Sequence, residues 1–182
     1  WTSRTSPVIG NCGAITWSPQ LGIFCAVGDG SPWSITSSDG ITWTSGGTLP
    51  SPGISWRGIS WNGTVFCAVE AAYGIAATST NGTSWTQRTM PDTTSWFAIV
   101  WDGVNFCATG AISSTAAISQ DGITWTSMNL PSSSAWVSSA YNGTVICVVS
   151  TQNAKAATIN LIEFIPLGTV SGTFFDFTQS TT

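Results

Sequence analysis

The segment WFAIVWDGVNFCA, residues 96–108, reveals the fold most clearly. Two apolar, β-prone runs flank Asp102-Gly103, a dipeptide that favours a tight hairpin turn. Residues 116–119 and 124–127 then predict two further strands around a second turn, Asp121-Gly122. The segment therefore predicts four short antiparallel strands within about 40 residues, and no window of the chain has convincing helical periodicity.

The same unit recurs four times, as four columns of matching residues show. The first column contains Trp1, Trp43, Trp85 and Trp125, and the second contains Trp17, Trp61, Trp101 and Tyr141. The third contains Cys25, Cys67, Cys107 and Cys147, and the fourth contains Cys12, Trp56, Trp96 and Trp136. Four strands in each unit of about 40 residues are typical of a propeller blade. The sequence therefore predicts an all-β, propeller-like fold over residues 1–160, with four blades of three to four antiparallel strands.

The two ends of the repeat array are complementary. The chain begins with what should be a fourth strand, Trp1–Thr5, whereas the last repeat has three strands and lacks the Trp strand. If the ring closes, Trp1–Thr5 supplies the missing strand and removes exposed sheet edges, which are aggregation sites. A four-bladed ring closed in this way is expected, with an incomplete piece of a larger propeller as the alternative.

Three copies of a turn motif lie between the third and fourth strands of their repeats. SSDGITW (37–43) and SQDGITW (119–125) resemble the Asp-box of sialidase-like propellers, and STNGTSW (79–85) is a looser copy. The turn residues are Asp39, Gly40, Asn81, Gly82, Asp121 and Gly122. Asp or Asn bonds the local backbone and Gly adopts a positive φ, so a structural role is expected. The repeat style WNGTVFCAV (61–69) is also similar to repeats in phage tail and bacterial surface proteins.

Charged residues are scarce: Lys and Arg number 4, Asp and Glu number 8, and the net charge is −4 with no His. A nucleic-acid partner is not expected, because the chain lacks a basic surface. The chain contains no apolar run of about 18 residues, so membrane insertion is not expected either. Without His, and without a Cys-x-x-Cys spacing, the sequence predicts no metal and no cofactor. The four repeat cysteines are instead expected to be buried free thiols.

The resemblance to sialidase-like propellers implies a test for catalysis, because those enzymes use an arginine cluster, a Tyr–Glu pair and an acidic Asp. This chain has only Arg4, Arg57 and Arg88, and Arg4 and Arg88 share one repeat position. Its only Glu residues are Glu70 and Glu163. Ordinary glycoside hydrolysis needs two facing carboxylates. The chain is therefore expected not to be an enzyme, and a sialidase-like glycosidase is the lesser alternative.

A binding site is expected where a residue breaks the repeat, because the repeat residues pack the blades. Trp33 is the only Trp outside the four columns, and it lies near Asp29 in a loop between a second and a third strand. Tyr73 occupies the equivalent loop of the next repeat. An aromatic face near a carboxylate suits stacking of a sugar ring, so Trp33, Asp29 and Tyr73 are the predicted ligand-binding residues. Packing of Trp33 over the core is the alternative.

Residues 161–182 lie outside the repeat and form a β-prone tail. Its aromatic residues are Phe164, Phe174, Phe175 and Phe177. Exposure of each to water would cost about 1.5–3 kcal/mol, so burial is expected, either in a hairpin on the propeller rim or at a contact with a neighbouring subunit. A head-to-tail contact of the second kind propagates into a filament.

Together these features predict a non-enzymatic surface module, extracellular or on a virion, such as part of a phage tail or a microbial surface appendage. Its expected role is structural, or the binding of a cell-surface glycan receptor, or both. A homo-oligomer or larger assembly is expected. A filament-forming subunit linked through the C-terminal tail is the alternative function.

Overall fold

The computed structural model describes residues 2–159 except 51, 53, 112, 153 and 154. All the elements of this described part are β-strands, and they form four antiparallel sheets in which the strand order follows the chain. The predicted all-β propeller of four blades, with three to four strands in each, is confirmed. The tail, with its four Phe residues, lies outside the described residues.

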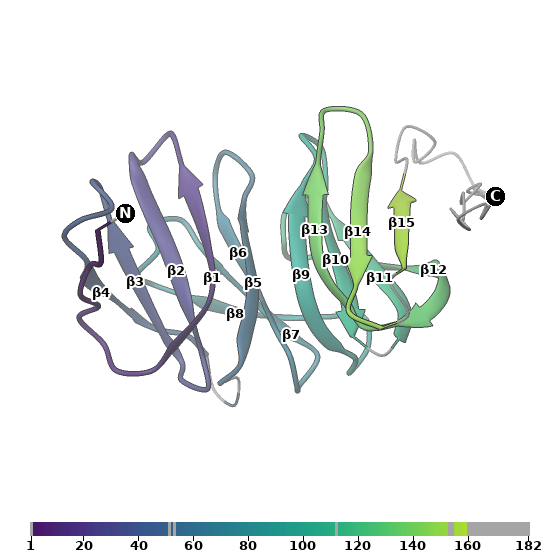
Figure 1. Ribbon diagram of the computed structural model, residues 1–182, viewed down its shortest axis with the longest axis horizontal. Helices are drawn as coiled ribbons and strands as arrows, with labels where there is room; N and C mark the ends of the chain where they lie inside the picture. The colour runs from purple at the N-terminus through teal and green to yellow at the C-terminus, as the bar shows by residue number, and fades with distance from the viewer. Residues whose placement is uncertain (1, 51, 53, 112, 153–154, 160–182) are drawn as a thin grey trace.

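Each sheet is one blade, and the blades are numbered in chain order (Figure 1). Blade 1 consists of β1 (Asn11–Ser18), β2 (Ile23–Asp29), β3 (Trp33–Ser37) and β4 (Thr44–Thr48). Blade 2 consists of β5 (Trp56–Trp61), β6 (Phe66–Glu70), β7 (Ile75–Ser79) and β8 (Thr86–Thr89). Blade 3 consists of β9 (Ser95–Trp101), β10 (Phe106–Ala111), β11 (Ser113–Ser119) and β12 (Thr126–Ser134). The described strands of blade 4 are β13 (Trp136–Tyr141), β14 (Ile146–Ser150) and β15 (Ala156–Ile159).

The first strands of the blades, β1, β5, β9 and β13, contact one another in that order. They therefore lie innermost, as expected when sheets are arranged around a central axis. Between the described parts of β13 and β1 there is no contact of comparable extent, and blades 1 and 4 lie at opposite ends of the long axis in Figure 1. The four blades thus form an open arc.

The structure differs from the expected closure of the ring by Trp1–Thr5. Residues 2–6 are not in a strand, and Arg4, Thr5 and Ser6 lie against blade 1. The open arc explains the difference. The described strands of blades 1 and 4 have no extensive contact, and the five peptide steps from Ser6 to the start of β1 at Asn11 span at most about 18 Å, so this segment stays beside blade 1.

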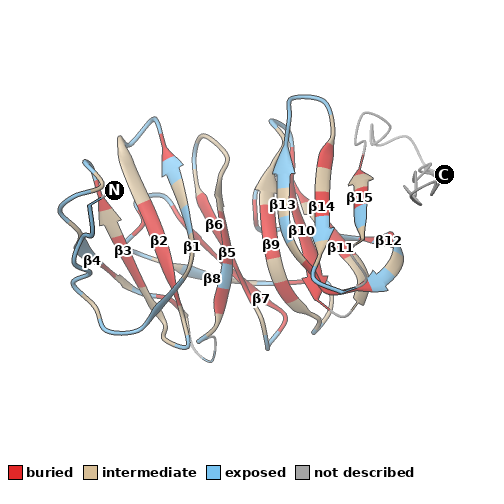
Figure 2. Ribbon diagram, viewed as in Figure 1, coloured by how far each residue is buried: buried red, intermediate tan, exposed pale blue. Residues whose placement is uncertain are grey.

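The hydrophobic core is divided into three clusters, each between two successive blades. We call the side of a blade that faces the preceding blade its leading face, and the side that faces the next blade its trailing face. Between blades 1 and 2, Val27 on a trailing face and Phe66 on a leading face are both fully buried. Figure 2 shows this burial along β2, β6 and β10, the second strands of their blades. Packing between neighbouring blades therefore holds the arc together.

The three turns that resemble the Asp-box are held by local hydrogen bonds. Asp39 Oδ1 accepts hydrogen bonds from the backbone N–H groups of Ile41 and Thr42, both at 2.8 Å. Asp121 and Asn81 make the equivalent bonds in their own blades. The following residues, Gly40, Gly82 and Gly122, have φ values of 68°, 75° and 74°. Such values favour glycine because a side chain is strained there.

These turns make stability depend on pH. Backbone N–H donors from Thr42 and Ile41 and the hydroxyl of Ser37 hold the pKa of Asp39 below its usual 3.8. Desolvation raises the pKa of Asp121, but the N–H groups of Thr124 and Ile123 outweigh it, so its pKa is lowered too. A carboxyl group with a lowered pKa in the folded state stabilises the fold above its unfolded pKa. That stabilisation is lost as pH falls through the folded pKa.

We therefore expect the double variant Asp39→Asn, Asp121→Asn to lose less stability than the parent when pH falls from about 7 to about 2. Asn81 already makes the same bonds in blade 2, so the amides fit the turns and stability near neutral pH should change little. Urea midpoints measured across this pH range test the difference. Parallel profiles for parent and variant would show that the two carboxylates do not contribute to the acid sensitivity.

Candidate functional site

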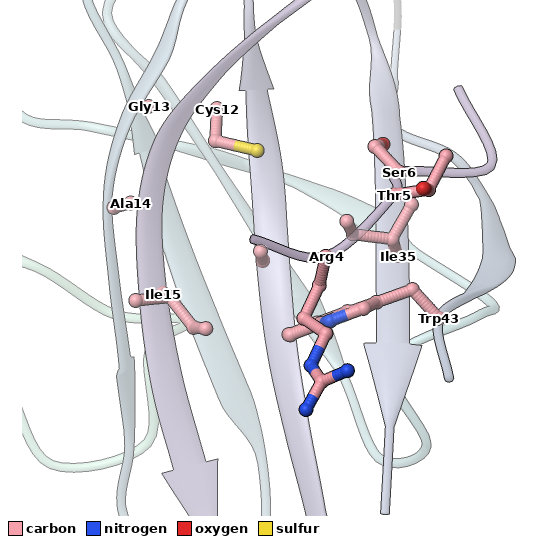
Figure 3. A pocket seen from close by; sticks show the side chains of 10 residues that line it. Arg4, Thr5, Ser6, Cys12, Gly13, Ala14, Ile15, Ile35 and Trp43 are labelled. Carbon is pink, nitrogen blue, oxygen red and sulfur yellow. The ribbon is translucent and has the colours of Figure 1, made fainter. Parts of the chain in front are cut away.

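A cavity of about 370 Å³ lies on the leading face of blade 1 (Figure 3). Its wall combines Ile15, Ile35 and Trp43 from the blade with Arg4 and its neighbours from the N-terminal segment. In Figure 3 the Arg4 side chain lies in front of the sheet, between Ile15 and Trp43. Arg4 is the one charged residue among those that line this cavity, so the lining includes no acid–base pair. It suits an apolar group.

The structure places Trp33 at the start of β3, half-buried. Its ring lies on Gly28, where an added Cβ would come within 2.9 Å of Trp33 Cε2. Its indole Nε1 is buried and has no hydrogen-bond partner among the described residues. One side of the ring therefore packs against the backbone of β2, in line with the alternative that the sequence left open.

Asp29 ends β2 and connects blade 1 to blade 2. Its Oδ1 accepts a hydrogen bond from the Ser55 hydroxyl, and its Oδ2 lies 3.0 Å from Arg57 Nη2 in an ion pair. The Asp29 side chain is 19% exposed. Both oxygens of the Asp29 carboxylate therefore have protein partners, and one of them holds the guanidinium of Arg57 in place.

Arg57 follows the buried Trp56 at the start of β5. Its guanidinium carbon lies 5.1 Å from the centroid of the Phe97 ring on β9, in cation–π geometry. The side chain remains 39% exposed. Arg57 therefore joins three blades, through Asp29 of blade 1 and Phe97 of blade 3, while presenting part of its guanidinium to solvent.

Glu70 ends β6 and is fully buried. Its Oε1 accepts a hydrogen bond from Ser55 N–H at 3.2 Å, and its Oε2 accepts from Ala72 and Tyr73 N–H at 2.7 and 2.8 Å. Glu70 therefore fixes the loop after β6 beside the start of β5. Tyr73, in this loop, is 49% exposed.

Asp29, Arg57, Glu70, Tyr73 and Phe97 form what we call the Arg57 cluster. All five lie at or near the same end of the blades, where first strands begin and second strands end. Of the predicted ligand-binding residues, Asp29 and Tyr73 are brought together here through Ser55 and Glu70, and Trp33 is not part of the cluster.

Sequence reasoning missed Arg57 and Glu70, although both depart from their repeat columns. Glu70 lies in a column with Gly28, Gly110 and Ser150, and Arg57 in one with Gly13, Phe97 and Val137. A single charged residue in an otherwise uncharged column is the signal that identifies them.

The chemistry available in the Arg57 cluster is that of recognition. Guanidinium remains protonated and binds carboxylate or phosphate with paired hydrogen bonds. Within the described part of the chain no three His, Cys, Asp or Glu side chains gather as a metal site. Burial raises the pKa of the Cys25 and Cys107 thiols to about 12 and raises that of Cys67 as well, so these three are inert thiols. Cys147 differs from the expected burial, since it is only partly buried. The residues that the structure describes include no helix suited to crossing a membrane.

No protein-family model and no curated protein matches the chain, whereas solved structures do. Virginiamycin B lyase from Staphylococcus aureus matches with a TM-score of 0.77 at 11% identity, covering 94% of this chain and 56% of that one. YCF48 bound to a D1 peptide matches with a TM-score of 0.68 at 17% identity, covering 96% and 56%. A chain of a nidogen–laminin complex matches with a TM-score of 0.69 at 13% identity, covering 82% and 60%.

These matches correct one expectation and leave another as a prediction. The chain spans little more than half the length of these proteins, and at such identities the likeness establishes the propeller fold alone. The prediction that the chain is not an enzyme is contradicted, because the propellers that it matches include lyases. These matched propellers are lyases and partner-binding proteins, rather than Asp-box or phage tail proteins, so that narrower resemblance stays a prediction.

Proposed function

We propose that the chain is a recognition propeller that binds a partner protein or peptide through a carboxylate at the Arg57 cluster. The observation behind this proposal is the position of Arg57, which is ion-paired to Asp29 at 3.0 Å and stacked over Phe97 at 5.1 Å while 39% of its side chain is exposed. A carboxylate of the partner pairs with the exposed edge of the guanidinium.

The cluster is preorganised for this role. An arginine held by an ion pair and an aromatic ring loses less side-chain freedom when it binds. Tyr73 lies in the loop after β6, which Glu70 fixes through two backbone hydrogen bonds. Arg and Tyr are both enriched among the residues that dominate binding energy at protein interfaces.

Two of the matched structures support a partner of this class. One is described as YCF48 bound to a D1 peptide, and another as a nidogen–laminin complex. Their likeness to this chain lies in the fold, so the site on this chain is argued from its own residues. The predicted extracellular or virion location is compatible with such a role and stays a prediction.

The proposal is tested by panning the 182-residue chain against a random peptide array and measuring the affinity of the selected peptides. We expect these peptides to contain Asp, Glu or a free C-terminal carboxylate. Arg57→Ala should weaken their binding about 30-fold, because loss of a central arginine costs about 2 kcal/mol or more. The affinity of Arg57→Lys should lie between those of the parent and Arg57→Ala, since lysine keeps the positive charge but lacks the planar guanidinium.

Arg88→Ala is the matched control. It also removes one positive charge, but Arg88 lies on β8, where its Nε donates to Thr78 Oγ1 at 3.0 Å. Equal losses in Arg57→Ala and Arg88→Ala, or no loss in either, would contradict the proposal. A glycan array run in parallel covers the glycan prediction, and glycan binding that depends on Tyr73 without any selected acidic peptide would replace the peptide partner.

A further inference from the structure

The interface between blades 1 and 2 and the interface between blades 2 and 3 repeat the same contacts. On leading faces, Ile59 and Ile99 occupy one column and are 6% and 8% exposed. On trailing faces, Val27 and Val69 occupy another column and are fully buried. Each of these two interfaces therefore joins a trailing face and a leading face with the same residues in these columns, whereas Thr109 and Ser139 occupy the two columns between blades 3 and 4.

At the two ends of the arc, the same columns have no partner blade among the residues that the structure describes. Ile15, the blade 1 equivalent of Ile59, is 55% exposed on a leading face. Val149, the blade 4 equivalent of Val27, is 44% exposed on a trailing face. One end of the arc thus presents the surface that the other end is built to cover.

The Asp-box turns repeat this pattern. A Cβ built on Gly82 lies 3.2 Å from Cys25 Sγ of the preceding blade, and a Cβ on Gly122 lies 3.2 Å from Cys67 Sγ. A Cβ built on Gly40, in the first blade, meets only Phe24 Cε2 of its own blade, at 3.6 Å. Cys147, in the last blade, is only partly buried. Among the described residues, Gly40 and Cys147 are therefore the two members of these columns that lack this contact.

The N-terminal segment fits the same arrangement. In sequence it repeats the Trp-Thr-x-Arg pattern of β8, an outer strand, and its residues 4–6 lie against the leading face of blade 1. That is the side on which a preceding blade would contribute its outer strand. The described strands of blade 4 are β13, β14 and β15, without such an outer strand.

We propose that two copies of the chain associate head to tail, with the trailing face of blade 4 in each copy packed on the leading face of blade 1 in the other. The N-terminal segment of one copy then lies beside β15 of its partner. The result is a two-fold symmetric ring of eight blades, within the size range of known propellers. The chain spans 48–60% of the length of seven solved structures that it matches. A second copy is the occupant because it supplies the same columns as the internal interfaces.

The test is the mass of the full chain in solution, measured by sedimentation equilibrium at micromolar concentrations. We expect twice the 19.0 kDa of one chain. Ile15→Asp and Val149→Asp should each give monomers. Both side chains are already largely exposed in the single chain, so the substitutions leave its own fold intact, as circular dichroism will verify. Ile123→Asp and Val104→Asp, at residues 48% and 60% exposed away from the end faces, are matched controls and should stay dimeric.

A mixture of the two variants separates this proposal from other modes of pairing. The Ile15→Asp copy keeps an intact trailing face and the Val149→Asp copy an intact leading face, so the mixture should regain dimers through one interface. A parent chain that stays monomeric, or that grows beyond two copies, would overturn the closed ring. Dimers that survive either single substitution would also overturn it, since they would show a face pairing with itself.

Discussion

Replacement of Glu70 with leucine is expected to lower the free energy of unfolding by about 3–5 kcal/mol. Glu70 is fully buried, and its carboxylate accepts the N–H groups of Ser55, Ala72 and Tyr73. Leucine leaves all three donors without this acceptor, and an unsatisfied buried donor costs about 1–3 kcal/mol. The expected loss is smaller than the sum of three such costs, because some of the freed N–H groups in the loop can form hydrogen bonds with water. Urea denaturation of parent and variant measures the change.

Glu70→Gln is the control for this prediction. It keeps the length of the side chain and one carbonyl acceptor, but its NH₂ group faces N–H donors. A smaller loss, about 1–2 kcal/mol, is expected. If leucine and glutamine both change stability by less than about 0.5 kcal/mol, the bonds of Glu70 do not hold the Tyr73 loop.

Replacement of Trp96 with alanine is expected to destabilise the fold by about 3–5 kcal/mol, because it leaves a large cavity in the core. Trp96 is fully buried between blades 2 and 3, in the cluster that contains Val69 and Phe106. The same urea measurement gives the size of the effect, with an unchanged slope showing that the transition remains comparable.

Two variants show whether burial causes that loss. Trp96→Phe keeps much of the volume and removes an indole N–H that has no partner among the described residues, so a loss below about 1.5 kcal/mol is expected. Tyr141→Ala removes an aromatic side chain that is 37% exposed and should cost less than Trp96→Ala. Equal costs for Trp96→Ala and Tyr141→Ala would contradict the assignment of the Trp96 column to the core.

The repeat columns were sufficient to predict the blades. Trp56, Trp96 and Trp136 recur because each is buried at the start of an inner strand, and Asp39 and Asp121 recur because each closes a hairpin. Such features are local, or they link neighbouring repeats at a fixed spacing. The periodicity of the sequence therefore reports them directly.

The periodicity of the sequence does not predict whether the ring of blades closes, nor does it predict the Arg57 cluster. Whether four blades close depends on the angle between neighbouring blades, which arises from the packing of whole faces and has no local sequence signature. Arg57 is positioned by Asp29 from the preceding blade and Phe97 from the following one. Trp33 looked like an exposed aromatic residue because the sequence does not show that Gly28 lies beneath its ring.

Chemical-shift mapping with a peptide selected on the array tests most directly the claim that the Arg57 cluster is the recognition site. Backbone ¹H–¹⁵N shifts should change at Arg57, at Phe97 and in the loop 71–74, and these changes should disappear in Arg57→Ala. The hairpin turns 62–64 and 102–104, at the opposite end of the blades, should remain unchanged. Shifts confined to those turns, or shifts around Arg57 that persist in Arg57→Ala, would contradict the account.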